Sequence, residues 1–264
     1  AVRYPGKFAG ATGNFAAHLA ADPQADWERL AEEFLAGLEL EWNPLTTQIE
    51  SHDWQVELFQ AMTHFNRVLH NLCTDAWSYI SRGVFRQIPQ PGTTGSSTMP
   101  HKINPIRFEN AEANLELSCA VLESLAATLA TTRLQRDLTD SSTQRNIGVA
   151  FGHSYLAIDN VRRGLREIDV DREVLAGELE HSWEVLGEAV QTVIRAERVA
   201  GRSSIEDPYA VLKELTRGRR VDAERLREFV DGLDIGAEAR QRLLELTPTA
   251  YTGRSSQLVD RLAD

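Results

Sequence analysis

One segment of the sequence combines the residue types that bind a small anionic ligand. Residues 95–105, GSSTMPHKINP, join small residues, three consecutive hydroxyl side chains and a lysine. Small residues let a ligand approach the backbone, hydroxyl groups donate and accept hydrogen bonds, and Lys102 adds a positive charge that suits a carboxylate or a phosphate. Composition alone leaves two interpretations open: an anion-binding loop, or a flexible surface loop of ordinary turn residues.

Long helices are predicted on both sides of this segment. Residues 52–82 contain no glycine or proline, and their apolar residues recur at steps of three and four. This pattern predicts one helix of roughly 46 Å, at about 1.5 Å per residue. Residues 107–134 lack glycine and proline as well and are rich in alanine, leucine and glutamate. A third helix is expected over 142–166, where Gly148 and Gly152 would permit close helix packing.

The order of these elements predicts an all-α fold. Three long helices in succession indicate a bundle, and no segment shows the sustained alternation of a large sheet. We expect a central helical-bundle domain over 1–166, with a long loop at 83–105 that is either functional or disordered. A smaller C-terminal helical domain is expected over 167–264. Its predicted helices are shorter and cover 171–179, 182–199, 208–216, 222–231 and 236–246.

Composition favours a soluble cytoplasmic protein. The 264 residues are 42% hydrophobic and carry a formal net charge of -11. A negative charge of this size creates an electric field that repels nucleic acids and anionic membranes. No apolar run reaches the length of a membrane span, and no signal peptide is visible. Cys73 and Cys119 are expected to be buried free thiols. We therefore expect no nucleic-acid or membrane partner, and the histidines lack the acidic and cysteine neighbours of a metal site.

The loop sequence GSSTMPHKIN resembles the GSSxMPxKxN signature of the fumarase/aspartase superfamily, whose members cleave C–N or C–O bonds and release fumarate. The flanking stretches WNPLTTQIESHD, LQRDLTDSSTQRN and ELEHSWEVLGEAVQTVIR narrow the resemblance to the adenylosuccinate lyase family. The match runs from about Pro5 to the C-terminus, with a short extra segment near residues 200–204. The resemblance implies a long-helix bundle of the fumarase/aspartase type.

The resemblance also implies a reaction. It is the β-elimination of fumarate from adenylosuccinate, giving AMP, and from SAICAR, giving AICAR, in purine nucleotide biosynthesis. It implies that no cofactor takes part. It further implies a cytoplasmic homotetramer in which each active site is assembled from three chains, and long helices fit that arrangement because they need partners along their length.

Three catalytic residues follow from the resemblance. Ser96 is the expected base, and Lys102 with the loop amides would stabilise the negative charge that builds on a substrate carboxylate. Glu109 resembles the carboxylate that orients the catalytic histidine of the family. Three alternatives stay open. The base could be Ser97, or Ser96 could be a turn serine that makes only a local hydrogen bond to the backbone. Glu109 could complement the dipole of its helix, a role that is compatible with orienting the histidine.

The resemblance supplies substrate-binding residues too. Those expected to hold the succinyl carboxylates and the polar edges of the substrate are Gln48, Ser96, Lys102, Asn104 and Asn110. Those expected to bind the nucleotide and its phosphate are Arg136, Ser141 and Arg145, because guanidinium groups suit an oxyanion. Two surface ion pairs, Arg136 with Asp137 and Asp140 with Arg145, are the alternative interpretation.

One family segment has no counterpart in these 264 residues. The family's general-acid histidine lies in a stretch similar to SRTHGQPATP, so the chain is expected to carry the base half of the site and to be the C-terminal portion of a longer enzyme. Two other functions stay open. One is another fumarate-releasing lyase, of the argininosuccinate lyase or fumarase type, and the other is a non-catalytic helical assembly module.

Overall fold

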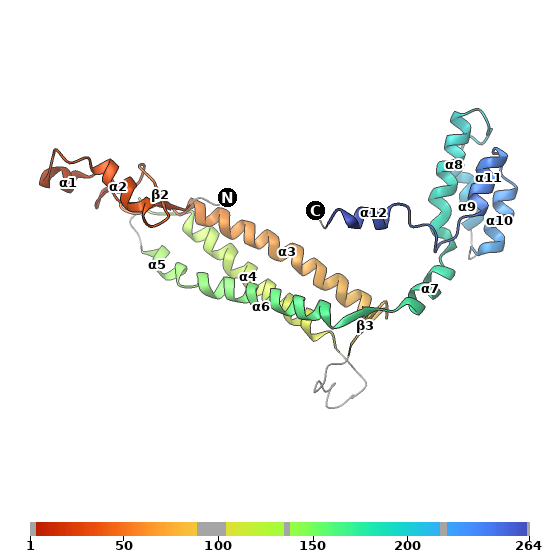
Figure 1. Cartoon of the computed structure of the whole chain (residues 1–264), viewed down its shortest axis with the longest axis horizontal. Helices are drawn as coiled ribbons and strands as arrows, with labels where there is room; N and C mark the ends of the chain where they lie inside the picture. Colours follow the sequence, from red (N-terminus) through yellow and green to blue (C-terminus); the bar gives the residue numbers. More distant parts are fainter. Residues whose placement is uncertain (1–3, 89–103, 135–137, 217–220, 263–264) are drawn as a thin grey trace. The chain divides into compact units, whose positions relative to one another are not determined.

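The computed structural model describes residues 4–88, 104–134, 138–216 and 221–262. These residues form helices with only four short strands, which confirms the predicted all-α class (Figure 1). The chain divides into two compact units, residues 1–169 and 170–264. Across the described residues, no helix is long and apolar enough to cross a membrane.

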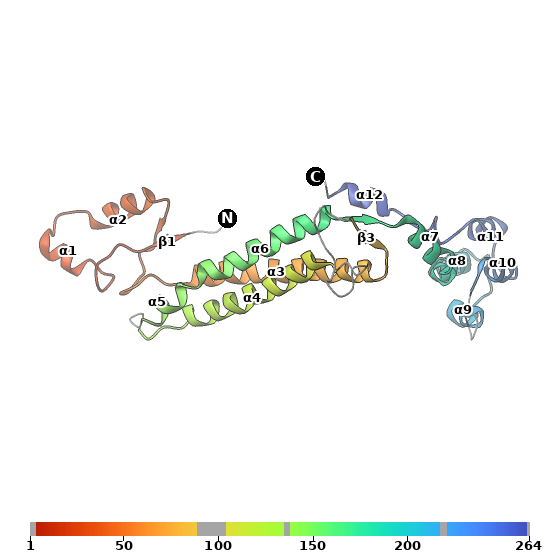
Figure 2. The same ribbon diagram turned by 90° about the horizontal axis from the view of Figure 1, so that it is seen from below.

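Three helices form the bundle of the first unit: α3 (Asp53–Ser81), α4 (Ile106–Leu129) and α6 (Ile147–Arg166). They lie side by side in both views of the chain (Figures 1 and 2). The helix predicted over 52–82 is confirmed to within one residue at each end. Its 29 residues extend about 43 Å. The helix predicted over 107–134 ends five residues early, at Leu129.

The core of the bundle contains two apolar clusters. One gathers Cys73, Phe108, Leu115 and Val161, and the other gathers Phe59 with residues that include Leu122, Leu129 and Ala150. Both cysteines are buried and free, as predicted. The spacing of apolar residues at steps of three and four thus places one stripe of each helix in a common interior.

Three fully buried polar side chains, one from each helix, are hydrogen-bonded to one another. Asn66 donates to Ser118 Oγ at 2.9 Å, and Ser154 Oγ donates to Asn66 Oδ1 at 2.6 Å. Ser118 Oγ in turn donates to the Ala150 carbonyl oxygen at 2.8 Å. Buried polar groups are costly unless they are paired, so this network fixes the axial register of the three helices.

The single helix predicted over 142–166 is wrong at its start. The structure has two helices there, α5 (Thr139–Gln144) and α6, with a break at Arg145 and Asn146. The Asn146 carboxamide donates to the Thr143 carbonyl oxygen at 3.3 Å. Asparagine side chains bind nearby backbone groups in this way and favour helix ends over helix interiors.

The packing role predicted for Gly148 and Gly152 is also wrong. A Cβ added at either glycine would meet no atom within 4 Å. The glycine of α6 that permits close packing is Gly164, where an added Cβ would lie 2.9 Å from Phe108 Cζ. The missing side chain is therefore needed near the C-terminal end of α6.

Short elements complete the first unit. The strands β1 (Pro5–Gly6) and β2 (Glu41–Trp42) form a parallel pair, and between them come α1 (Ala16–Ala21) and α2 (Trp27–Ala36). The strand β3 (Phe85–Gln87), which follows α3, pairs with β4 (Ile168–Val170), which follows α6. An ion pair of 2.8 Å between Arg86 and Asp169 joins the same two segments.

The second unit is a smaller helical assembly. Its elements are α7 (Arg172–Glu180), the 3₁₀ turn η1 (Trp183–Leu186), α8 (Gly187–Val199), α9 (Pro208–Thr216), α10 (Ala223–Asp231), α11 (Ala237–Leu244) and α12 (Ser255–Asp260). Its core includes Leu186, Val190, Ile194 and Val230. Asp171 and Asp222 accept backbone N–H groups at the starts of α7 and α10, which explains where those helices begin.

Candidate functional site

The predicted site residues that the structure describes form two groups at opposite ends of α4. One group follows the signature loop and comprises Asn104, Glu109 and Asn110. The other comprises Gln48, just before α3, and Ser141 and Arg145, in and just after α5. The 24 residues of α4 separate the two ends by about 36 Å. Ser96, Lys102 and Arg136 lie outside the described residues.

Glu109 lies in the first turn of α4 and is exposed. Its Oε1 atom accepts a hydrogen bond of 3.1 Å from the indole Nε1 of Trp77 on α3. A carboxylate in the first turn also complements the helix dipole, so this alternative role is compatible with the site role. The contact with Trp77 orients Glu109 and leaves its other oxygen, Oε2, for a further donor.

Asn110 belongs to a row of amide side chains between α4 and α6. Its Oδ1 atom accepts from Asn160 Nδ2 at 2.9 Å and from Asn114 Nδ2 at 3.2 Å. Asn114 Oδ1 lies 2.8 Å from His153 Nδ1. Because these bonds engage its carbonyl oxygen, the Asn110 side chain can present its NH₂ group as a donor to a ligand.

Arg107 ties the start of α4 to the end of α6. Its guanidinium meets the Glu167 carboxylate at 3.3 Å through Nε and 3.4 Å through Nη2, and its Nη1 reaches Asn160 Oδ1 at 3.4 Å. Arg107, Asn160 and Trp77 are not among the residues predicted from the sequence. No short motif marks them, since each has its partner on a different helix.

A buried histidine links the two segments that carry the second group. His52 is the N-cap residue of α3 and is 9% exposed. Its Nε2 lies 3.3 Å from Asp140 Oδ2, and the Gln144 amide lies 3.4 Å from the ring. Asp140 Oδ1 accepts the backbone N–H of Ser141 at 2.7 Å. Asp140 therefore pairs with His52, and the alternative ion pair between Asp140 and Arg145 does not form.

Glu50 lies between Gln48 and His52 and is fixed by two donors. Its carboxylate accepts from Asn43 Nδ2 at 3.2 Å and from Trp54 Nε1 at 3.1 Å. Partial burial raises the pKa of Glu50, and the two hydrogen bonds oppose that rise. Gln48 itself is exposed.

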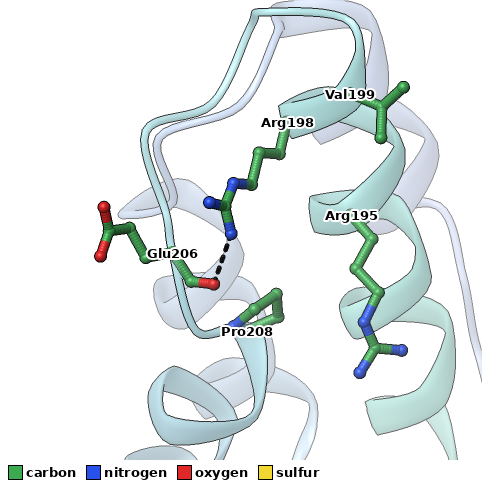
Figure 3. Close-up of a pocket in the computed structure, with 5 residues that line it drawn as sticks. All are labelled: Arg195, Arg198, Val199, Glu206 and Pro208. Carbon is green, nitrogen blue, oxygen red and sulfur yellow. Dashed lines mark hydrogen bonds between the residues drawn. The ribbon is translucent and has the colours of Figure 1, made fainter.

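Two concave surfaces are lined by other residues. A groove of about 510 Å³ runs between α3 and α4 and is lined by residues that include Thr63, His64 and Ala127. A pocket of the second unit is lined by Arg195, Arg198, Val199, Glu206 and Pro208 (Figure 3). There Arg198 donates to the Glu206 carbonyl oxygen at 2.7 Å, which holds the end of α8 near the start of α9.

Within the described ranges, no group of three or more histidine, cysteine, aspartate or glutamate side chains is arranged to hold a metal ion. The donors at both ends of α4 are amides, hydroxyl groups and a guanidinium, which suit carboxylate and phosphate oxygens.

Comparison with known proteins identifies the family. The model described as "Adenylosuccinate lyase C-terminal" matches residues 132–252, and the model described as "Lyase" matches residues 3–121. The adenylosuccinate lyase of Escherichia coli K12 is 49% identical over 99% of this chain and 56% of its own length. The relative from Vibrio cholerae is 49% identical over 97% of this chain and 55% of its own length. The relative from Haemophilus influenzae is 47% identical over 98% of this chain and 55% of its own length. The chain spans about half the length of the curated relatives it matches, and it belongs to the adenylosuccinate lyase family.

Proposed function

We propose that this chain belongs to an enzyme that removes fumarate from adenylosuccinate and SAICAR by β-elimination, leaving AMP and AICAR. One observation carries the proposal: identity of 49% to the Escherichia coli adenylosuccinate lyase extends over 99% of the chain. The stretch GSSTMPHKIN lies within that match. The two buried free thiols support a reducing, cytoplasmic location.

The reaction makes two chemical demands. A proton must leave a carbon beside a carboxylate, and the nitrogen leaving group must gain one. We assign the first step to Ser96 as base. A serine hydroxyl is a poor base unless its alkoxide is stabilised, so Lys102 and the loop amides must supply positive charge and N–H donors. Glu109, held by Trp77, would orient the histidine that protonates the leaving nitrogen.

We assign binding of the substrate to both ends of α4. Asn104 and Asn110 would hold the succinyl carboxylates beside Ser96, and Gln48 would bind a further polar edge. Ser141 and Arg145, with Arg136, would bind the nucleotide and its phosphate. All of these residues belong to the bundle domain proposed over 1–166.

The separation of the two groups supports a shared active site. One nucleotide cannot reach across the roughly 36 Å of α4, so both groups bind one substrate only if they come from different copies of the chain. Large apolar side chains on the surface of the bundle support packing against other copies; Val68 is 61% exposed and Tyr155 is 76% exposed. We therefore propose a homotetramer with active sites shared between subunits.

The test is a substrate comparison on two proteins. One is the chain alone, and the other is a chimera that joins the uncovered part of the Escherichia coli relative to these 264 residues. The active form is whichever of these two proteins cleaves adenylosuccinate. We expect release of fumarate and AMP from adenylosuccinate, with no cleavage of argininosuccinate and no hydration of fumarate. Failure of both proteins on adenylosuccinate, or preference for another substrate, would contradict the proposal.

The assignment of the base is tested in the active form. Ser96→Ala is expected to lower kcat by a factor of about 10² to 10⁴, which is the contribution of a positioned base. Ser97→Ala is the matched control because it removes the neighbouring hydroxyl. If Ser96→Ala keeps a near-normal kcat, or if Ser97→Ala lowers kcat more than Ser96→Ala does, Ser96 is not the base.

A further inference from the structure

We propose that His52 is a positioning residue that ties the helix carrying Ser141 and Arg145 to the segment carrying Gln48, through its hydrogen bond with Asp140. The inference rests on the proposed function, because it explains how the residues assigned to the nucleotide are kept together. His52 itself touches none of those three side chains in a bond that the structure shows, so its role is indirect.

Helix α5 needs an external support. It has six residues, and none of them is buried. A helix of this length does not persist on its own in water, because the cost of nucleation exceeds the gain from so few hydrogen bonds. Its place must therefore come from side-chain contacts with longer elements. Ser141 lies inside α5 and Arg145 is its C-cap residue, so whatever holds α5 also holds them.

His52 supplies such a contact from a rigid element. It sits at the start of α3, and its side chain is 10% exposed, compared with 21% for Asp140. The Asp140 carboxylate bridges the two segments, because Oδ2 faces His52 Nε2 at 3.3 Å while Oδ1 accepts the Ser141 N–H at 2.7 Å. The Gln144 amide also reaches the imidazole at 3.4 Å. One buried ring thus contacts both ends of α5.

The same ring sets the position of α5 relative to Gln48. His52 follows Gln48 by four residues, and the intervening Glu50 is tied to α3 by the Trp54 indole at 3.1 Å. His52 and Asp140 are 88 residues apart in the sequence. Their bond joins the segment that carries Gln48 to the helix that carries Ser141. The His52 side chain makes no capping hydrogen bond to α3, so this convergence points to a positioning role for the ring.

The first experiment measures hydrogen exchange in the 264-residue chain. His52→Gln removes the imidazole, and His70→Gln is the control, since His70 meets Glu116 at 3.5 Å on the α3–α4 surface, away from α5. We expect exchange of residues 138–146 to become about tenfold faster in His52→Gln alone. Exchange in the α3–α4–α6 core should not change. If His52→Gln fails to fold, Asp140→Asn tests the same bond.

The second experiment measures kinetics in the active form. His52→Gln is expected to raise KM about tenfold and to leave kcat within about threefold, because it disturbs binding residues and spares the base. Asp140→Asn should behave alike, and the double variant should be no worse than either single variant. A merely structural role would lower kcat and thermal stability together or leave KM unchanged.

Several results would overturn the inference. These are unchanged exchange over 138–146 in His52→Gln, complete exchange of that segment in the unmodified chain at the earliest time, and an unchanged KM in an active His52→Gln enzyme. If neither the chain nor the chimera cleaves adenylosuccinate, the proposed function fails. Exchange then still decides whether His52 holds α5.

Discussion

Trp77 and Glu109 join the end of α3 to the first turn of α4, with the indole Nε1 donating to Glu109 Oε1 at 3.1 Å. An indole N–H only donates, so it fixes Glu109 as an acceptor and limits the rotation of a side chain that is otherwise exposed. The next contact along the helix pair joins Thr74 Oγ1 to Glu112 Oε1 at 2.7 Å. The two contacts are similar in structure, but only the first involves a predicted site residue.

This difference gives the first prediction. Trp77→Phe should lower kcat of the active form about tenfold, because the lost hydrogen bond to a charged group is worth about 1.5 kcal/mol. Thr74→Val removes the adjacent contact and should stay within about twofold of the unmodified enzyme. Steady-state release of fumarate measures both. An equal fall of kcat in the two variants would show that the bond from Trp77 has no special role in catalysis.

A second prediction concerns the buried polar network. Ser154→Ala leaves Asn66 Oδ1 without its 2.6 Å donor inside the bundle. The free energy of unfolding should fall by about 1–3 kcal/mol, which is the cost of a buried unpaired acceptor. Ser81→Ala is the control, because Ser81 is exposed. It should change the free energy of unfolding by no more than about 0.5 kcal/mol. Urea unfolding followed by circular dichroism compares them, and equal stability of the two variants would argue against the network.

A third prediction is that alanine substitutions at two glycines of α6 change the stability of the chain in opposite directions. At Gly164 an added Cβ would lie 2.9 Å from Phe108 Cζ, and Phe108 is fully buried and cannot move aside. Gly164→Ala should therefore destabilise the chain by about 1–3 kcal/mol. Gly152→Ala meets no atom within 4 Å, so it should stabilise the helix by about 0.5–1 kcal/mol. Thermal unfolding distinguishes them, and a stabilising Gly164→Ala would show that this contact is not tight.

A fourth prediction follows from an ion pair in the second unit. Glu197 is 3% exposed, and Arg202 binds it through Nε at 2.8 Å and Nη2 at 2.6 Å. These bonds, with the Gly236 N–H, lower the pKa of Glu197 from 4.5 to about 2. A lowered pKa in the folded chain adds stability above the unfolded value, and that stability is lost as the pH falls from about 4.5 to about 2.

The pH dependence is measured on the variant Arg202→Gln. Its Tm should lie below that of the unmodified chain at pH 7, and the gap should close as the pH falls through this range. Arg195→Gln is the control, because Arg195 donates to Gln191 Oε1 at 2.9 Å and not to Glu197. A gap that stays constant with pH would mean that Glu197 does not carry the effect.

The sequence predicted the long helices well because their apolar spacing repeats over many turns. It did not predict the break before α6, which depends on local bonding of the Asn146 side chain to the backbone. It also misplaced the close helix contact, since Gly148 and Gly152 face open space while Gly164 meets Phe108. A glycine in a helical pattern does not reveal which face of the helix it occupies.

The site residues stay predictions. Resemblance assigned roles to Asn110, Glu109, Ser141 and their companions, because these residues lie in stretches whose letters match the family. It did not identify the contacts of Trp77 or His52, whose partners are 32 and 88 residues away along the chain. Such pairs arise from the register of packed helices, which no local pattern encodes.

In the proposed enzyme, residues from opposite ends of the bundle, in different copies of the chain, serve one site that cleaves adenylosuccinate. Subunit complementation tests this arrangement: two active-form variants, Ser96→Ala and Arg145→Leu, are mixed, dissociated and reassembled. Each alone should release almost no fumarate, whereas random reassembly should restore about a quarter of the sites. If the mixture has exchanged subunits and is still as inactive as its components, the two groups of residues do not share a site between copies.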